Sequence, residues 1–178
     1  LAGTRSALGS VGFLLQGGLR REFLKAREAA QKALEIDDRL GKAHTVLGMF
    51  RLHYDWDFKG ARRAFERAVQ LAPSDPGVLN GYAWYLILVE GNVEEALEYS
   101  ERLLRVAPLD VFWRGERVRH FVFAREYERA LDEIERIREM NSDFVQLDEV
   151  TAYDMLGRDE EAHRAVMEWY RRAGAGTD

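Results

Sequence analysis

The sequence predicts an all-α protein, built as a stack of about five antiparallel helix–turn–helix repeats. Three observations predict this fold: a pattern that recurs about every 35 residues, apolar residues three and four positions apart within each copy, and prolines placed only where helices are expected to end or begin. The chain has 178 residues, of which 47% are hydrophobic and 32% are charged. That length and balance are sufficient for one domain with a hydrophobic core.

An alanine marks the repeat. It recurs at intervals of 35, 35, 34 and 32 residues, at Ala26, Ala61, Ala96, Ala130 and Ala162. Pro73 and Pro108 are also 35 residues apart. Two packed helices lie about 8 to 10 Å apart, so their crossing needs a small side chain on at least one of them. We therefore expect each alanine to lie near the start of the second helix of a repeat, at a helix crossing.

The third repeat shows the pattern within one unit. A first helix is expected over Val78 to Glu90, and a second helix is expected from near Val93 to Pro108, with Gly91-Asn92 as the turn between them. Glu94 and Glu95 stand in the first turn of the second helix, where they complement the helix dipole. The residues expected to face inward are Leu79, Tyr82, Ala83, Leu86 and Ile87 on the first helix, and Ala96, Leu97, Leu103 and Leu104 on the second.

We predict one domain over residues 1–178, with repeats at approximately 19–39, 40–74, 75–109, 110–142 and 143–173. Residues 1–18 fit no repeat and are expected to form an irregular or helical lid over the second helix at 22–36. The second repeat carries an extra residue at its turn. Trp56 stands there where a glycine is expected, and Arg125 stands at the turn of the fourth repeat.

Composition excludes several classes of function. The net charge of −5 does not favour nucleic acid or an anionic membrane as partner, and no apolar run is long enough to span a membrane. The chain has no cysteine, which fits a reducing compartment, so we expect a cytoplasmic protein. We find no glycine-rich phosphate loop, nucleophile elbow or paired-carboxylate site. We therefore expect neither enzymatic activity nor a cofactor.

These residues resemble the tetratricopeptide repeat (TPR) family over roughly residues 20 to 172. The match includes Leu47-Gly48, the Gly91 turn, the recurring alanines, and Pro73 and Pro108 at the ends of repeats. The resemblance implies a right-handed α-solenoid. The stretch His53 to Phe58 is more specifically similar to the repeat arrays that follow adenylate cyclase, winged-helix or kinase-type output domains in bacterial regulators.

In a TPR-like stack the first helices line a concave groove. The resemblance therefore implies a binding groove for a peptide or helix of a partner protein. The alternative for any one of its residues is that it packs against the next repeat. The groove residues are expected to be Met49, Leu52, His53, Tyr85, Leu88, Val89, Phe112, Arg119, Val122 and Phe123.

The favoured function is a non-enzymatic protein-interaction module within a larger bacterial signalling or regulatory protein. The alternative is a self-association module that forms a homodimer. An enzyme with an unrecognised site is a third and less favoured hypothesis.

Two smaller clusters allow other interpretations. His53, Asp55 and Asp57 offer metal-ligand types, but at a helix end we expect one of the aspartates to cap the next helix, with Trp56 and Phe58 wedged between helices. The second is a basic cluster, for which the alternative interpretation is a site that binds an acidic peptide. Its members are Arg114, Arg117, Arg119 and Arg125.

Overall fold

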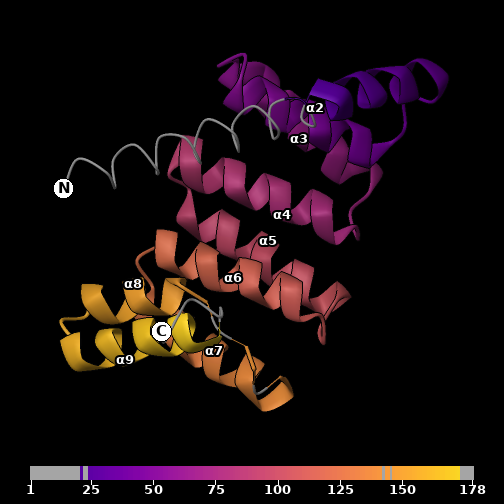
Figure 1. Cartoon of the computed structure of the whole chain (residues 1–178). Helices are drawn as coiled ribbons and strands as arrows, with labels where there is room; N and C mark the ends of the chain where they lie inside the picture. The colour runs from indigo at the N-terminus through magenta and orange to yellow at the C-terminus, as the bar shows by residue number, and fades with distance from the viewer. Residues whose placement is uncertain (1–20, 22–23, 142, 145, 173–178) are drawn as a thin grey trace. The chain divides into compact units, whose positions relative to one another are not determined.

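The computed structural model describes residues 21, 24–141, 143–144 and 146–172, and within them the chain forms helices joined by short turns, without β-strands (Figure 1). The prediction of an all-α helical-repeat fold is confirmed. The chain divides into two compact units, Leu1–Pro73 and Ser74–Asp178. The single domain over residues 1–178 and the bounds of its repeats stay predictions. The described part of the chain contains no helix that is both long and apolar enough to cross a membrane.

The first unit contains a helix at 24–36 and a helical hairpin, α2 (Gly41–His53) and α3 (Phe58–Leu71). The hairpin is tight because Gly48 lies against the ring of Phe65, where an added Cβ would come within 3.0 Å of the ring. Ala61 is fully buried, as expected, but Ala26 is exposed and Ala30, one turn later, is buried instead. The alanine series therefore does not extend into the helix at 24–36. The lid that residues 1–18 are expected to form lies outside the described residues.

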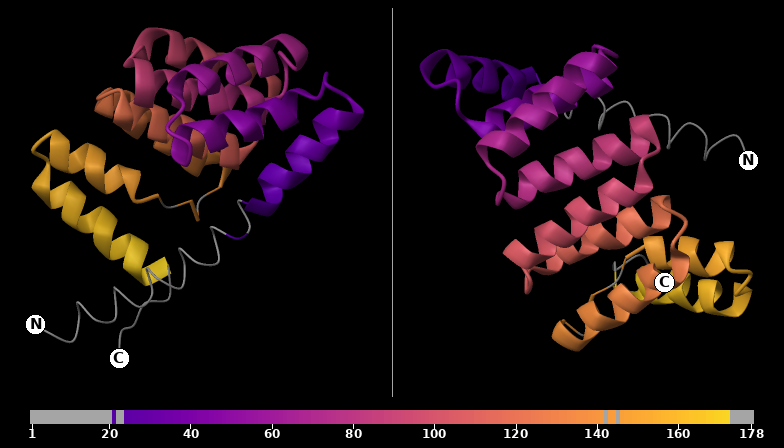
Figure 2. Two further views of the ribbon diagram at one scale, coloured as in Figure 1. Left: turned by 90° about the horizontal axis from the view of Figure 1, so that it is seen from above. Right: turned by 180° about the vertical axis from the view of Figure 1, so that it is seen from behind.

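The second unit contains three further hairpins. The first consists of α4 (Pro76–Tyr85), continued by the π-helical turn η1 (Leu86–Glu90), and α5 (Val93–Val106). The second is α6 (Val111–Phe123) with α7 (Tyr127–Met140), and the third is α8 (Asp148–Met155) with α9 (Asp159–Arg172). Helix α6 contacts both α4 and α8, so the first helices of successive hairpins lie side by side (Figures 1 and 2).

Aspartates set the starts of three helices. The side chain of Asp57 accepts a hydrogen bond from the backbone N–H of Gly60 at 2.8 Å, which caps α3 as expected. Asp75 does the same for α4, where it accepts from Gly77 at 2.9 Å. Asp110 caps α6. Each cap satisfies backbone donors that have no partner within their helix, and so determines where the helix begins.

The turns inside the hairpins share one left-handed residue. Its φ is +53° at Trp56, +63° at Gly91, +62° at Arg125 and +69° at Gly157. Trp56 and Arg125 thus occupy the positions at which the repeat pattern predicts glycine. In the second and third repeats, the backbone N–H that follows the left-handed residue donates a hydrogen bond to the carbonyl oxygen six residues earlier. These bonds run from Asp57 N to Arg51 O and from Asn92 N to Leu86 O. In the fourth repeat the corresponding bond, from Glu126 N to Phe121 O, spans only five residues. The extra residue predicted for the turn of the second repeat is therefore also present in the third.

The core of the second unit follows the predicted faces. Ala96 and Ala130 have no exposed surface and Ala162 is 9% exposed. The second helices α5 and α7 bury apolar side chains against the first helices, with α8 covering one end of the core. This core contains Leu79, Leu103, Val118, Phe121, Ile134, Ile137 and Ala152.

Candidate binding surface on the first helices

The ten residues predicted for the groove divide by burial. Those in the first unit are Met49, which is half-buried, Leu52, which is buried, and His53, which is exposed. In the second unit Tyr85 and Val122 are buried and Val89 is half-buried. Tyr85 stacks on Tyr82 of the same helix, and Val122 belongs to the hydrophobic core around α6 and α7. The exposed members are Leu88, Phe112, Arg119 and Phe123.

One side of α6 presents three of these four exposed residues together. Phe112, Gly115, Arg119 and Phe123 are three and four residues apart and so lie along one face of the helix. The side chain of Phe112 is 62% exposed and that of Phe123 is 54% exposed. Phe123 rests edge-on against Trp84 of α4, with ring centroids 5.1 Å apart. This face, which we call the α6 face, combines aromatic surface with one arginine.

A cavity of about 390 Å³ adjoins the α6 face. It lies between α6 and the segment that leads from α7 into α8, and its lining includes Phe112, Arg119, Phe144 and Asp148. Gly115 forms part of its wall, where an added Cβ would lie 3.3 Å from Gln146 Oε1 and 3.7 Å from the Phe144 ring. The absence of a side chain at Gly115 therefore keeps the segment close to α6 and leaves space beside Phe112.

Gln146 attaches the segment to α6. Its Nε2 donates to the carbonyl oxygen of Gly115 at 3.1 Å and to Asp148 Oδ2 at 2.7 Å. Its Oε1 is buried and has no hydrogen-bond partner. Sequence reasoning missed Gln146 and Asp148 because their role depends on a loop that returns to a helix about 30 residues earlier in the chain.

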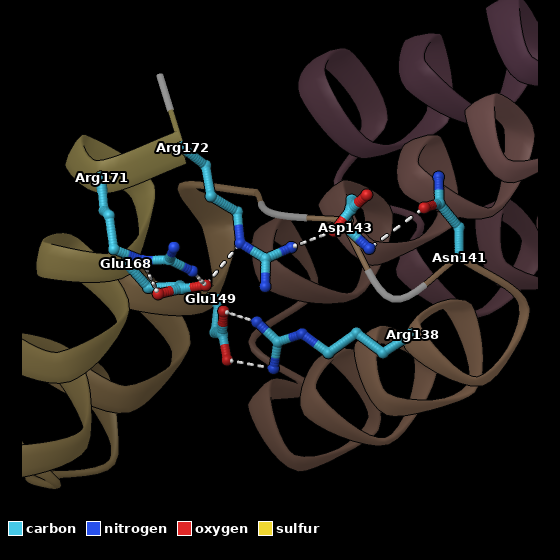
Figure 3. Close-up of polar contacts among 7 residues, drawn as sticks. All are labelled: Arg138, Asn141, Asp143, Glu149, Glu168, Arg171 and Arg172. Atoms are coloured by element: carbon cyan, nitrogen blue, oxygen red, sulfur yellow. Dashed lines mark hydrogen bonds and ion pairs between the residues drawn. The ribbon is translucent and has the colours of Figure 1, made fainter. Parts of the chain in front are cut away.

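Ion pairs hold both ends of this segment (Figure 3). Arg138 of α7 pairs with Glu149 of α8 through two hydrogen bonds. Asn141 Oδ1 accepts from the backbone N–H of Asp143 at 3.1 Å, and Arg172 of α9 lies 3.4 Å from Asp143 Oδ1. The wall of the cavity is therefore anchored to α7, α8 and α9.

Arg119 is held at the surface by a buried carboxylate. Glu116 is 6% exposed and forms an ion pair with Arg119. Its Oε2 also accepts hydrogen bonds from Trp84 Nε1 at 3.0 Å and from Asn80 Nδ2 at 3.4 Å. The Arg119 side chain remains 44% exposed. Glu116 was not predicted, because a glutamate in a charged stretch has the same sequence pattern as a solvated surface residue.

The stretch from His53 to Phe58 forms a capped turn. Asp57 caps α3, and Asp55 lies 3.5 Å from Arg27. Among the described residues, no three histidine, aspartate or glutamate side chains come together as a metal ion would require. The expectation that Trp56 and Phe58 wedge between helices is wrong: they are 71% and 43% exposed and contact each other edge-on. The left-handed turn at Trp56 places this side chain on the surface.

The predicted basic cluster is divided among different surfaces, and Arg125 is exposed at the turn between α6 and α7. Arg119 lies on the α6 face, whereas Arg114 and Arg117 face α5 and α7, where both pair with the buried Glu133. Burial lowers the pKa of Arg117, against the opposing effect of Glu133 and Glu101. The structure therefore does not bring these arginines together into one acidic-peptide site on the α6 face.

The fold is similar to that of a solved protein, YrrB, described as a TPR protein with an unusual peptide-binding site. The TM-score is 0.62 at 18% sequence identity, and the similarity covers 91% of this chain and 82% of YrrB. No model of a known protein family and no curated protein matches the sequence. The chain thus has a TPR-like fold, as its repeats predicted.

Proposed function

We propose that this protein is a non-enzymatic interaction module that binds a peptide or helix of a partner protein on the α6 face. The observation that carries the proposal is the arrangement of two exposed phenylalanines on either side of Arg119, beside a cavity of about 390 Å³. Aromatic and arginine side chains are enriched at the centres of protein interfaces because they bury a large area at a low entropy cost. The peptide-binding site of YrrB, which has a similar fold, supports the same class of function.

The geometry favours separate binding roles for the cavity and for Arg119. An apolar side chain of the partner enters the cavity between Phe112 and Phe144, where it loses contact with water. Arg119, already held by Glu116, donates its remaining N–H groups to a carbonyl or carboxylate of the partner. Leu88 of η1, which is 48% exposed, is a further exposed apolar residue of the second unit.

The resemblance of His53 to Phe58 to the arrays of bacterial regulators supports a wider context. In that context the module belongs to a larger cytoplasmic signalling protein and communicates the presence of a partner to an output domain. Such coupling requires that the partner bind two states of the larger protein with different affinity.

A peptide-display selection on the parent chain, followed by fluorescence anisotropy with the selected peptides, tests the proposal. Phe112→Ala/Arg119→Glu should weaken binding at least tenfold, because it removes both the apolar wall and the charged donor. Gly115→Ala should weaken binding without altering either side chain, because it narrows the cavity. Phe58→Ala/Arg63→Glu, which changes the same residue types at exposed positions of α3, should leave the affinity unchanged.

Equal affinity of the parent and the Phe112→Ala/Arg119→Glu variant for every selected peptide would exclude the α6 face as the binding surface. Failure of the selection to yield any peptide would contradict the proposal that the module binds peptides.

A further inference from the structure

A second surface of the second unit separates its charges by sign. Two cavities of about 430 and 440 Å³ lie along α5 and α7, and both are lined by Glu101. We call this surface the α5–α7 strip. It is made of second helices and of the side of α6 that carries Arg114 and Arg117, so it is separate from the α6 face and does not depend on the proposed peptide binding.

One end of the strip is acidic. Its cavity is lined by Glu94, Glu98, Glu101 and Glu126, with Arg129 as the basic residue. All four glutamates are exposed. Arg129 lies over the ring of Phe121, 4.5 Å from its centroid. Because the N-terminal ends of α5 and α7 both contribute to this cavity, their glutamates accumulate at the same end of the strip.

The other end of the strip is basic. Its cavity is lined by Arg105, Arg114, Arg117 and Arg136, against Glu101 and Glu133. Arg105 is exposed and the Arg136 side chain is 62% exposed. Glu133 is 1% exposed and is paired with Arg114, while Arg117 and Arg136 lie at 3.9 and 3.6 Å from its other oxygen. Three arginines share one buried carboxylate, so positive charge remains in excess at this end.

Arg117 lies where the two ends of the strip meet and also pairs with Glu101, at 3.8 Å. Its Nε is buried without a hydrogen-bond partner, and so is Glu133 Oε2 beside it. Burial lowers the pKa of Arg117 even though Glu133 and Glu101 oppose the shift. The guanidinium groups that a carboxylate of another chain can reach at this end are those of the exposed Arg105 and Arg136.

We propose that the α5–α7 strip is a self-complementary interface through which two copies of this chain pair about a two-fold axis near Glu101. In a two-fold interface the same patch is used by both copies, so a patch with an acidic and a basic end meets itself with opposite charges in contact twice. Glu94 and Glu98 of one copy then lie opposite Arg105 and Arg136 of the other. The half-buried Leu97 adds apolar surface to the strip.

Sedimentation of the full chain over a range of concentrations tests this pairing. The parent should dimerise reversibly, and raising the salt concentration from about 50 to 500 mM should weaken the dimer, because exposed charge pairs are screened. Arg105→Glu/Arg136→Glu makes both ends acidic, and Glu94→Arg/Glu98→Arg makes both ends basic. Each variant alone should dimerise at least tenfold more weakly than the parent.

A 1:1 mixture of the two variants provides the decisive measurement. Opposite charges face each other again in the mixed pair, so a heterodimer should form with an affinity close to that of the parent. The heterodimer would also show that both variants are folded. Arg63→Glu/Arg67→Glu, at exposed positions of α3, changes the net charge as much as Arg105→Glu/Arg136→Glu does and should dimerise like the parent.

A parent that stays monomeric at all concentrations would overturn the proposal. It would also be overturned by variants that dimerise like the parent, or by a mixture that fails to recover the dimer although circular dichroism shows both variants folded.

Discussion

Arg138 and Glu149 form a two-bond ion pair that joins α7 to α8, with Nη1 2.9 Å from Oε1 and Nη2 2.6 Å from Oε2 (Figure 3). The Glu149 side chain is 6% exposed and that of Arg138 is 27% exposed. The pair links two successive hairpins, and the segment between its members carries Phe144 and Gln146, which line the cavity at the α6 face. The ion pair that joins the two hairpins therefore also holds the segment that lines the candidate binding surface.

Arg138→Met should lower the free energy of unfolding by about 2 to 3 kcal/mol. The substitution leaves the Glu149 carboxylate buried without its charged partner, and an unpaired buried charge is strongly destabilising. Because Arg138 is partly exposed, the loss of stability should be smaller than for a fully buried ion pair. Urea denaturation measures the change. Arg171→Met, which removes an exposed partner of Glu168, should cost much less stability than Arg138→Met, because exposed ion pairs contribute little. Equal losses in the two variants would contradict the structural role given to Arg138.

Gly91→Ala should destabilise the protein by about 1 to 2 kcal/mol. Gly91 has a φ of +63° and an added Cβ would meet nothing within 4 Å, so the penalty arises from the left-handed backbone alone. Arg125→Gly, at the equivalent turn with a φ of +62°, should be neutral or stabilising by up to about 1 kcal/mol. Thermal melts of both variants measure these changes in stability. A destabilising Arg125→Gly would mean that the arginine side chain contributes more than its backbone strain costs.

Ala96→Leu should destabilise the protein by about 1 to 3 kcal/mol through overpacking, because Ala96 has no exposed surface in the core between α4 and α5. Ala26→Leu is the matched control, since the sequence places both alanines in one series but Ala26 is exposed. The control should change stability by less than about 0.5 kcal/mol. Similar melting of the parent and Ala96→Leu would show that this helix crossing is misplaced.

Acid should destabilise the second unit through His120. This side chain is fully buried, with Nδ1 3.1 Å from Ser100 Oγ. Burial, together with the charges of Arg119 and Arg117, lowers its pKa from 6.5 to about 3. Between these two values the unfolded chain binds a proton that the folded chain does not. His120 should therefore reduce the free energy of unfolding as pH falls from about 6.5 toward 3, by up to about 1.4 kcal/mol per pH unit.

Urea denaturation at pH 7, 6 and 5 measures this effect, with His120→Phe/Ser100→Ala as the control. The control keeps an aromatic ring, cannot titrate there, and removes the hydroxyl that would otherwise lose its partner. The parent should lose stability faster than the control as pH falls. Parallel pH dependence in the two proteins would show that His120 does not titrate differently on folding.

The period of the alanines and the apolar spacing were sufficient to predict the hairpins, including the turn at Gly91 and the span of α5 from Val93. Both features are local: a helix needs only its own sequence to define its ends and its apolar face. A cap at the start of α3 was predictable for the same reason, although the sequence left open whether Asp55 or Asp57 forms it. Trp56 and Arg125 stood at turns as departures from the expected glycine, and the structure shows that both have a left-handed backbone.

The surfaces required the tertiary structure. Sequence spacing placed Tyr85 and Val122 beside Phe112 and Phe123 on one predicted groove, but only packing against neighbouring helices decides which of them reaches solvent. The burial of Glu116 and Glu133, and the return of Gln146 to Gly115, depend on contacts between residues 16 to 36 positions apart in the chain. A repeat pattern reports what one helix must bury, whereas a binding surface is determined by what several helices together leave exposed.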